Sequence, residues 1–518
     1  MGLHPLYDPV PLDRLTRGMP IRRLDDTHNP PIRDIQEDSR RVRAACLFVA
    51  RRGEATDGLA HAPAAIAAGA AAILTDRPYQ IPPDLNQIPV LQTDQLPDAA
   101  GTIAQRLLGQ PAEKLNVIGI TGTNGKTTTA YLLRHLLNTI GQTAGMIGTI
   151  EIDTGHSQTP AQLTTPGLID THHLLAQMVA QHCAACIMEV SSHALQQNRV
   201  AAILFAAAIF TNLTGDHLDY HKTTEAYAAA KAKLFDQLDP QSGQPIVNAD
   251  DPWHQTMLDG RTFPATPKRF AITAADVGSA DTRAVIDHID AHRTRIQLTS
   301  TTGAVTVESP LIGKHNVYNL LAAVAAAERF GLDLSDPHLP DIIAQLPGTP
   351  GRLERVIGDD AAPPFTVLVD YAHTDDALRN VLTALRPLCP AQLRVLFGCG
   401  GDRDATKRPR MAAVACELAD RIVITSDNPR TEDPTQIIND ILTGVPADAR
   451  SRAAVVPDRA HAIQQIVHDA QPHDIVLLAG KGHEDYQILG TQRIDFDDRL
   501  HARAALHALN QTPARADS

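Results

Sequence analysis

One stretch of this chain has the residue types and spacing of a phosphate-binding loop. In residues 119–133, GITGTNGKTTTAYLL, Gly122 and Gly125 shortly precede Lys126 and Thr127. The run before it is typical of a buried strand, and the run after it of an amphipathic helix. Backbone N–H groups at a helix start favour an anion, a lysine can reach terminal phosphates, and a threonine hydroxyl can bind magnesium. We therefore predict a nucleotide site here.

Further polar side chains follow strand-like segments near this loop. Glu189 ends the strand-like run before SSH, and His217 lies in DHLDYH. A carboxylate at the carboxyl edge of a strand beside a phosphate loop can hold a hard cation. Lys231 lies in a helical stretch, where most lysines are solvated, and no spacing rule distinguishes it from Lys233.

A second group of polar residues follows four strand-like segments in the last third of the chain. These segments are FTVLVD, LRVLFG, RIVITS and DIVLLAG, and the residues after them include Arg403, Arg430 and Glu484. Ligands of open α/β sheets bind outside the carboxyl ends of the strands, so these residues should line one crevice. Two guanidiniums and a carboxylate predict a pocket for an amino acid that carries an extra carboxylate.

The elements that must position these residues indicate an α/β protein of three domains. We expect an N-terminal α/β domain over 1–112, a central domain over 113–347 with a parallel sheet of the P-loop ATPase type, and a Rossmann-like C-terminal domain over 348–518. The segment LPGTPGRLERV, rich in proline and glycine, is predicted to be a linker, and HARAALHALNQTPARADS a last helix with a frayed tail.

Composition excludes several classes of protein. The formal charge is −13, which disfavours nonspecific nucleic-acid binding. Six cysteines in 518 residues do not make a disulfide scaffold, and the C-x-x-C at Cys183 and Cys186 is expected to be buried and reduced. No apolar run reaches the ~20 residues needed to span a bilayer. With no signal-peptide core at its start, the chain is expected to be cytoplasmic, without membrane insertion.

The motifs together resemble the Mur ligase family, the ATP-dependent amide ligases of peptidoglycan precursor synthesis. They occur in the family's order: GTNGKTT, EVSSHAL, TNLTGDHLDYH, GKHNVYN, PGRLE, DYAHT, GCGGDRD, DNPRTEDP and GKGHEDYQ. The family's loop is shorter than the common G-x-x-x-x-G-K-[ST] pattern, which accounts for Ile120 where that pattern requires glycine. Within the family, the arginine of DNPR favours the addition of meso-diaminopimelate to the D-glutamate of UDP-N-acetylmuramoyl-L-alanyl-D-glutamate.

The resemblance implies a role for each matched residue. Lys126, Lys231 and His217 would be catalytic, and Thr127, Glu189, His217 and Lys231 would hold Mg2+, with Lys231 modified to a carbamate (N6-carboxylysine). ATP would contact Gly122, Thr123, Asn124, Gly125, Lys126, Thr127, Thr128, Asn316, Arg352 and Asp370. The UDP-muramoyl dipeptide would contact Ser39, Thr164, Thr165, Ser191, Gln197 and Arg199. Diaminopimelate would contact Arg403, Asp427, Asn428, Pro429, Arg430, Gly480 and Glu484.

Two other functions remain open from the sequence. A lysine-adding or folylpolyglutamate-type ligase could use the same scaffold, although a guanidinium facing the terminal ammonium of lysine would be repulsive. A non-catalytic nucleotide-binding regulator is the second alternative, and it leaves the four polar strand ends unexplained. The expected partners are small-molecule substrates only, and the expected state is a monomer.

Overall fold

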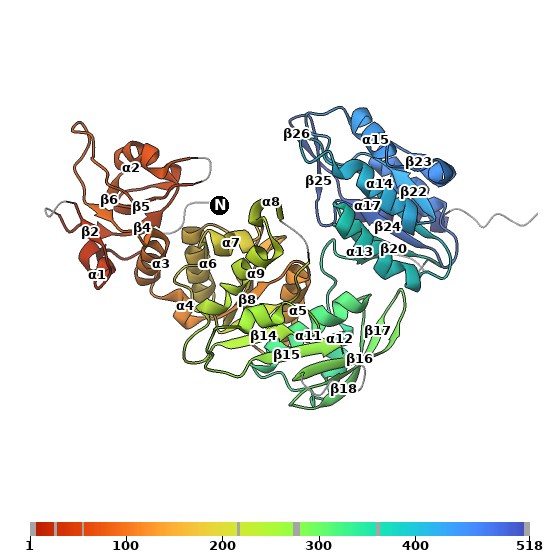
Figure 1. Cartoon of the computed structure of the whole chain (residues 1–518), viewed down its shortest axis with the longest axis horizontal. Helices are drawn as coiled ribbons and strands as arrows, with labels where there is room; N and C mark the ends of the chain where they lie inside the picture. The colour runs from red at the N-terminus through yellow and green to blue at the C-terminus, as the bar shows by residue number, and fades with distance from the viewer. Residues whose placement is uncertain are drawn as a thin grey trace, which may run out of the picture. The chain divides into compact units, whose positions relative to one another are not determined.

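The computed structural model describes residues 7–24, 28–53, 56–214, 218–272, 280–358 and 363–511. The chain divides into two compact units. Figure 1 labels its helices and strands and colours them by residue number. The first unit comprises Met1–Ala271, Val277–Thr282 and Asn319–Asp333, and the second Ile272–Asp276, Arg283–Tyr318 and Leu334–Ser518. The expected mixed α/β class is confirmed, whereas the domain limits predicted from the sequence stay a prediction.

The first unit begins with a small sheet in the order β2-β7-β6-β5-β4. Its strands are β2 (Arg22–Arg23), β4 (Asp34–Gln36), β5 (Cys46–Ala50), β6 (Ala70–Thr75) and β7 (Val90–Gln92). The strands are parallel except β2. Helices α1 (Leu12–Thr16) and α3 (Leu96–Leu107) share a core with Leu168 and Ile169 at the start of α6 (Leu168–Ala180), while α2 (Ala62–Ala67) packs on a second cluster.

The main sheet of this unit carries the phosphate loop. Its order is β11-β10-β9-β12-β8-β13-β14-β15, and β9, β12, β8, β13, β14 and β15 run parallel. The bounds are β8 (Asn116–Thr121), β9 (Ala144–Ile147), β10 (Glu151–Asp153), β11 (Gln158–Pro160), β12 (Ala185–Glu189), β13 (Ala207–Phe210), β14 (Gln244–Asn248) and β15 (Lys268–Ile272). Alternate residues of β8, β12 and β13 pack with α6 and α9 (Thr224–Ala232), as period-two burial requires.

The second unit holds an antiparallel meander and a six-stranded sheet. The meander is β16 (Thr282–Ile289), β17 (Thr294–Thr299) and β18 (Ala304–Ser309). The sheet order is β19-β20-β24-β21-β22-β23, with β19 (Glu354–Val356), β20 (Thr366–Asp370), β21 (Leu393–Phe397), β22 (Arg421–Ile424), β23 (Ala453–Val455) and β24 (Ile475–Ala479). Only β19 is antiparallel to its neighbour among these described strands.

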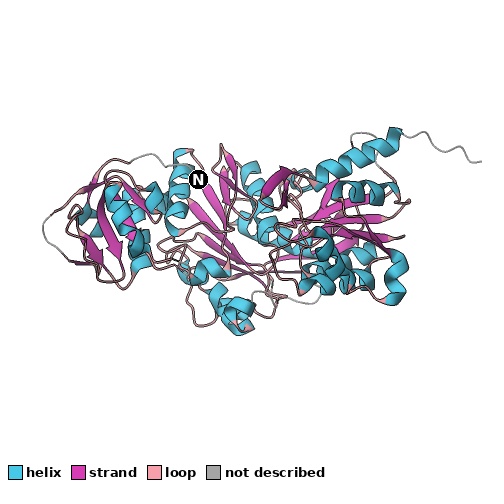
Figure 2. Cartoon of the chain, turned by 90° about the horizontal axis from the view of Figure 1, so that it is seen from above, coloured by secondary structure: helices cyan, strands magenta, loops and turns pink. Residues whose placement is uncertain are grey.

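Helices cover both faces of the six-stranded sheet. Figure 2 shows helices in cyan on either side of the magenta strands. On one face α13 (Asp375–Leu385), α14 (Lys407–Leu418) and α15 (Pro434–Leu442) pack with Leu368 and Val395. On the other face α16 (Arg459–His468) and α17 (Asp498–Gln511) pack with Val369 and Leu396. Because β20, β24, β21 and β22 are parallel, their carboxyl ends meet at one edge, as predicted.

The predicted linker and the predicted last helix both contain regular secondary structure. The predicted linker LPGTPGRLERV does not stay irregular, because Glu354–Val356 forms the edge strand β19 and pairs with β20. The predicted last helix is present as α17, while the tail after residue 511 lies outside the described residues.

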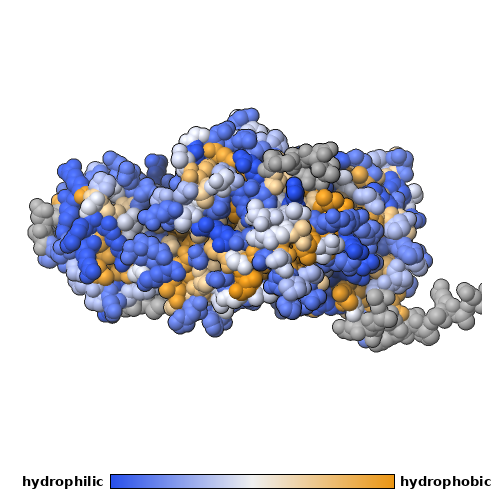
Figure 3. Space-filling model, turned by 90° about the horizontal axis from the view of Figure 1, so that it is seen from below, coloured by the Kyte–Doolittle hydropathy of each residue, from blue (hydrophilic) through white to orange (hydrophobic). Residues whose placement is uncertain are grey.

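All six cysteines are free and buried, including Cys183 and Cys186, which confirms the buried thiols. Across the described ranges no helix combines the length and apolarity needed to cross a bilayer. On the face drawn in Figure 3, apolar side chains form small patches among hydrophilic ones.

Candidate functional site

The predicted phosphate loop connects β8 to α5 (Lys126–Thr139). Gly122 and Gly125 have φ values of 151° and 86°, which L side chains rarely adopt. A Cβ on Gly122 would lie 1.9 Å from Thr211 Oγ1, and one on Gly125 would lie 2.3 Å from Asn319 Oδ1. Both glycines are therefore required by backbone conformation and by space.

The segment after β13 holds this loop in place. Asn124 N donates to Asn212 Oδ1 at 3.0 Å, and Thr211 Oγ1 donates to the carbonyl of Asn124 at 2.6 Å. Thr123 Oγ1 accepts from the N–H of Thr214 at 3.0 Å. Lys126 Nζ donates to the carbonyls of residues 122 and 123 at 2.8 and 3.0 Å, so its ammonium already lies over the loop.

Glu189 lies at the end of β12, beside the start of α5. Its Oε2 accepts from Thr127 Oγ1 at 2.9 Å and from Thr149 Oγ1 at 3.0 Å, and its Oε1 accepts from Thr149 N at 2.8 Å. Thr127 and Glu189 are both buried. Two predicted metal ligands thus bring a hydroxyl and a carboxylate together at the helix start.

Lys231 is a buried side chain that reaches the phosphate loop. It is 1% exposed, its Nζ donates to the carbonyl of Gly122 at 2.8 Å, and it lies 4.2 Å from the ring centre of Tyr227. The alternative of a solvated helical lysine is wrong for this position. His217, the other predicted metal ligand, lies outside the described residues.

Four of the six residues predicted for the muramoyl dipeptide lie together. Arg199 Nη1 donates to the carbonyl of Thr165 at 2.9 Å, and its Nε and Nη2 donate to Gln197 Oε1 at 2.9 and 2.6 Å. Thr165 Oγ1 accepts from Ser191 N at 3.1 Å. Thr164 is bonded to Thr149, whose hydroxyl lies 3.0 Å away.

The sixth residue, Ser39, begins the 3-10 helix Ser39–Arg41. Nearby, Arg51 donates to the carbonyl of Gln197, and its Nη1 lies 3.9 Å from Glu37 Oε1. Burial raises the pKa of Glu37 above its ordinary value, while Arg51 opposes that shift. Arg41 pairs with Asp170 at 2.7 Å.

Three predicted nucleotide contacts belong to the second unit. Asn316, in α11 (Lys314–Glu328), donates from Nδ2 to the carbonyl of Ile312 at 2.8 Å. Asp370 ends β20 and accepts from Leu353 N and Ala372 N at 2.8 and 2.9 Å. Burial raises the pKa of Asp370, and the guanidinium of Arg352 opposes this.

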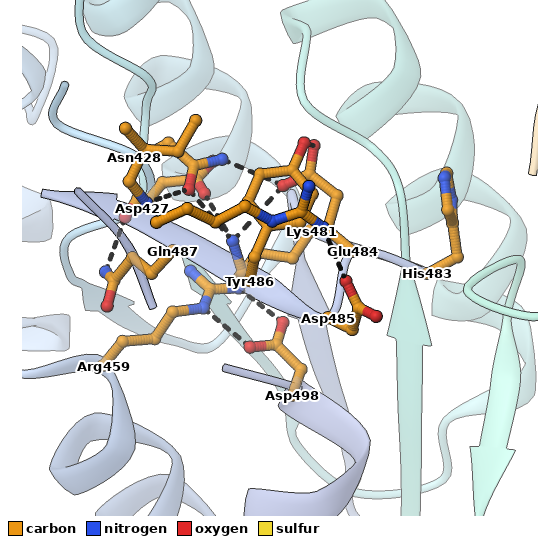
Figure 4. A network of polar contacts seen from close by, with 12 residues as sticks. Asp427, Asn428, Arg459, Lys481, His483, Glu484, Asp485, Tyr486, Gln487 and Asp498 are labelled. Carbon is orange, nitrogen blue, oxygen red and sulfur yellow. Dashed lines mark hydrogen bonds and ion pairs between the residues drawn. The ribbon is translucent and has the colours of Figure 1, made fainter. Parts of the chain in front are cut away.

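The predicted acceptor pocket centres on a lysine that the sequence reasoning did not single out (Figure 4). Lys481 is 0% exposed, and its Nζ lies 3.4 Å from Asp427 Oδ1, 3.4 Å from Asn428 Oδ1 and 3.3 Å from Glu484 Oε2. Asn428 Nδ2 donates to Glu484 Oε2 at 2.9 Å. The carboxylates that follow β22 and β24 therefore share one buried cation, which offsets their mutual repulsion.

A second buried ion pair lies beneath this cluster. Arg459 binds both carboxylate oxygens of Asp498, at 2.8 and 2.6 Å, and donates to the carbonyls of Ala479 at 3.0 Å and Ser426 at 3.4 Å. These carbonyls precede Gly480 and Asp427, so Arg459 ties the two strand ends together, as Figure 4 shows in part.

The two predicted guanidiniums lie on neighbouring loops of the same edge. Arg430 donates from Nη1 to the carbonyl of Gly401 at 2.8 Å. A Cβ atom on Gly401 would lie 1.9 Å from the carbonyl oxygen of Pro429. Arg403 is exposed and donates to the carbonyl of Asp402 at 3.2 Å. The loops after β21 and β22 thus pack directly on each other.

Several residues that shape these sites were missed by the sequence reasoning: Arg51, Thr149, Asn212, Asn319, Arg408 and Lys481. Lys481 and Asn212 do lie within motifs that were recognised, GKGHEDYQ and TNLTGDHLDYH. Position in a motif was thus the available signal, but only the fold shows which motif residues are buried together.

The fold and these sites define a nucleotide-binding α/β protein with a cluster of polar side chains at a second sheet edge. Three family models match the chain: Mur ligase family, catalytic domain, at residues 31–107; Mur ligase middle domain, at 120–327; and Mur ligase, glutamate ligase domain, at 351–482.

Curated relatives match nearly the whole chain. A protein of Synechococcus elongatus named UDP-N-acetylmuramoyl-L-alanyl-D-glutamate--2,6-diaminopimelate ligase is 47% identical over 485 residues, covering 92% of this chain and 94% of the relative. A relative of the same name from Trichormus variabilis is 43% identical over 477 residues, with coverages of 92% and 94%.

Solved structures agree. One titled as a UDP-N-acetylmuramoyl-L-alanyl-D-glutamate--2,6-diaminopimelate ligase is 33% identical, with a TM-score of 0.69 and coverages of 98% of this chain and 100% of that chain. A folylpolyglutamate synthase from Mycobacterium tuberculosis, at 18% identity, TM-score 0.57 and coverages of 80% and 95%, shares the fold alone. The chain belongs to the Mur ligase family, and it is therefore an ATP-dependent ligase.

Proposed function

We propose that this protein joins meso-diaminopimelate to the D-glutamate of UDP-N-acetylmuramoyl-L-alanyl-D-glutamate and consumes ATP. The names of relatives at 43–47% identity support this reaction. The observation that carries the choice of acceptor is Arg430, which lies on the same sheet edge as Asp427 and Glu484. A guanidinium binds a carboxylate, and the two acids bind an ammonium, so the edge complements an amino acid with charges of both signs.

The chemistry must overcome the low reactivity of a carboxylate. Its negative charge repels nucleophiles, and oxide is a very poor leaving group. Transfer of the γ-phosphoryl group of ATP to the side-chain carboxylate of D-glutamate gives an acyl phosphate and ADP. The backbone N–H groups at the start of α5 and the ammonium of Lys126 would stabilise the charge that develops on the phosphoryl oxygens.

The second half of the reaction forms the amide bond. The neutral amine of diaminopimelate attacks the acyl carbon, the tetrahedral intermediate expels phosphate, and the amine nitrogen loses its proton. Arg403, Arg430 and Glu484 orient the acceptor, and Asp427, Asn428, Pro429 and Gly480 form the walls around it. Thr164, Thr165, Ser191, Gln197, Arg199 and Ser39 are the proposed contacts of the nucleotide-linked dipeptide.

Magnesium fits the residues at the phosphate loop. Thr127 and Glu189 supply a hydroxyl and a carboxylate 2.9 Å apart, and this ion takes oxygen ligands, commonly one or two carboxylates completed by substrate phosphates. In the described ranges no three His, Cys, Asp or Glu side chains form a metal cluster of their own. When bound, magnesium would neutralise phosphate charge.

Lys231 and His217 remain proposed as further metal ligands. An uncharged lysine amine that takes up carbon dioxide and releases a proton becomes a carbamate, an anion with oxygen donors. Lys231 is buried beside the phosphate loop, so an anion there would lie close to a metal at Thr127 and Glu189. The monomeric state and the cytoplasmic location stay predictions from the sequence.

Release of ADP tests this proposal. The purified protein should release ADP rapidly only when the UDP-muramoyl dipeptide and diaminopimelate are both present. Equal rates with either one omitted would contradict a ligase mechanism. A lysine-adding or folylpolyglutamate-type ligase remains the alternative, and it would be favoured if lysine or glutamate replaced diaminopimelate as acceptor.

A further inference from the structure

A buried arginine behind the predicted acceptor pocket has no role in the mechanism so far. Arg408, in the first turn of α14, is 2% exposed. Its Nη1 donates to Asp440 Oδ2 at 2.8 Å, and its Nη2 donates to Glu432 Oε1 and Oε2 at 2.9 and 2.8 Å. One guanidinium therefore binds a carboxylate of α15 and a carboxylate of the loop that carries Arg430.

Glu432 passes this connection to the neighbouring loop. Its Oε1 also accepts from the backbone N–H of Asp402. The carboxylate of Asp402 in turn accepts from Thr431 N at 3.2 Å and from Thr431 Oγ1 at 2.8 Å. The loops after β21 and β22 are thus joined in both directions, and Arg408 lies at the base of the network.

The network holds two residues in unusual backbone conformations. Asp402 and Arg430 have φ values of 53° and 52°, in the left-handed region that favours glycine. Such conformations persist only where surrounding contacts impose them, and they concentrate at functional sites. The backbone of Arg430 is held further, because its N–H donates to the carbonyl of Ile488 at 3.1 Å and its carbonyl accepts from Gly490 N at 2.8 Å.

The charges matter as much as the geometry. Glu432 lies two residues from Arg430 and is a potential partner for that guanidinium. Because Arg408 binds both carboxylate oxygens of Glu432, that carboxylate is already engaged. Among the residues that the structure describes, Arg430 forms no ion pair, and its side chain donates a hydrogen bond only to the carbonyl of Gly401.

We propose that Arg408 is a positioning residue that, through Glu432, holds the guanidinium of Arg430 available for the far carboxylate of the acceptor amino acid. This inference rests on the proposed function, because it concerns the acceptor of that reaction. Arg408 itself does not contact the acceptor. Its removal should therefore weaken acceptor binding and leave the nucleotide substrates unaffected.

Two substitutions test the role from both ends of the contact. Arg408→Lys keeps the charge but loses the fork that binds Glu432 and Asp440 together. Glu432→Gln keeps the shape and removes the charge. Each should raise the KM for diaminopimelate by about 10-fold or more, because losing one charge-assisted hydrogen bond weakens binding by about that factor. The KM for ATP should change by less than about 2-fold.

Arg394→Lys is the matched control. Arg394 is also buried, at 8% exposure, and its Nε donates to Asp474 Oδ2 at 2.6 Å, but it lies at the amino end of β21, away from the pocket. It should lower the thermal midpoint, as Arg408→Lys should, without raising the KM for diaminopimelate. An equal rise in that KM with Arg394→Lys would overturn the proposal, since general loosening would then explain it.

A double substitution separates positioning from stability. In an Arg430→Ala background, Arg408→Lys should add less than about 2-fold to the KM for diaminopimelate, because the group that it positions is gone. A full additional rise, or an unchanged KM in the single variants, would overturn the proposal while leaving the function intact. If the unsubstituted enzyme fails to use diaminopimelate at all, the proposed function falls, and this inference falls with it.

Discussion

Lys231 Nζ donates a hydrogen bond of 2.8 Å to the carbonyl oxygen of Gly122, although 109 residues separate them in the chain. Gly122 is the first glycine of the phosphate loop, and the lysine is almost fully buried on α9. A buried lysine here can act in two ways. It can hold the loop as a cation, or it can become a carbamate and support a metal.

Lys231→Arg distinguishes these two roles. Arginine keeps a cation beside the loop but cannot form a carbamate, so we expect kcat to fall by about 100-fold or more, as when a preorganised electrostatic group is lost. Steady-state rates, measured in bicarbonate-supplemented and CO2-depleted buffer, check this. Lys233→Arg is the control. Lys233 Nζ donates to Gln196 Oε1 at 3.1 Å and does not bind the phosphate loop. Nearly full activity of Lys231→Arg would exclude the carbamate.

Gly122→Ala should greatly weaken nucleotide binding. The new methyl group would lie 1.9 Å from Thr211 Oγ1, and φ at this residue is 151°. We expect the Kd for ATP, measured by isothermal titration calorimetry, to rise by about 100-fold or more, since misplacing a site by ~1 Å can cost that much. Gly348→Ala, where no atom lies within 4 Å, should bind ATP normally. Normal binding by Gly122→Ala would refute the phosphate-loop assignment.

Arg430→Ala should act on the acceptor alone. Losing one charge-assisted contact to a carboxylate is expected to reduce kcat/KM for diaminopimelate by roughly 10- to 100-fold, with the KM for ATP unchanged. Arg421→Ala removes an exposed arginine at the amino end of β22 and should have no effect on turnover. Unaffected diaminopimelate turnover in Arg430→Ala would show that the pocket is assigned wrongly.

His172 should make the protein sensitive to mild acid. It is fully buried, its Nε2 lies 3.0 Å from the carbonyl of Ala201, and burial lowers its pKa from 6.5 to about 4. Between those pH values the unfolded chain binds the proton and the folded chain does not. The free energy of unfolding should therefore fall as pH drops from 6.5 towards 4, by about 1.4 kcal/mol per pH unit.

Urea unfolding at pH 7.5 and pH 5.0 measures this loss. Glutamine at position 172 cannot titrate. The urea concentration at the unfolding midpoint of His172→Gln should therefore differ less between the two pH values than that of the unsubstituted protein. Above pH 7 the contribution of this group should be constant. Equal pH dependence in the two proteins would mean that His172 does not govern the acid response.

Much of the fold could be predicted because the pattern of burial is local. The strand of residues 46–50 and the four strands of the last sheet follow from short apolar runs, and their carboxyl ends meet as parallel topology requires. The edge strand β19 was missed, because the three residues at the end of the proline- and glycine-rich segment LPGTPGRLERV carry little periodic signal. Their partner β20 supplies the hydrogen bonds that make them a strand.

Residue type and spacing were enough to predict that Lys126 and Thr127 lie at a helix start after a glycine-containing turn, while their roles stay a prediction. The site was not predictable where the role depends on partners distant in sequence. Lys481 is important because it binds Asp427, which lies 54 residues earlier in the chain. Arg408 is important because it binds Glu432, which lies 24 residues later. For Lys231 the sequence offered only the resemblance to a family. Its burial beside the phosphate loop adds a physical reason to expect a role in the site.

The mass of the reaction product tests the central claim most directly. The purified protein is incubated with ATP, magnesium and UDP-N-acetylmuramoyl-L-alanyl-D-glutamate, with diaminopimelate and lysine offered together in equal amounts. The account predicts a product heavier than the nucleotide substrate by one diaminopimelate residue, with one ADP released for each product formed. A product carrying lysine, or ADP release without any heavier product, would contradict it.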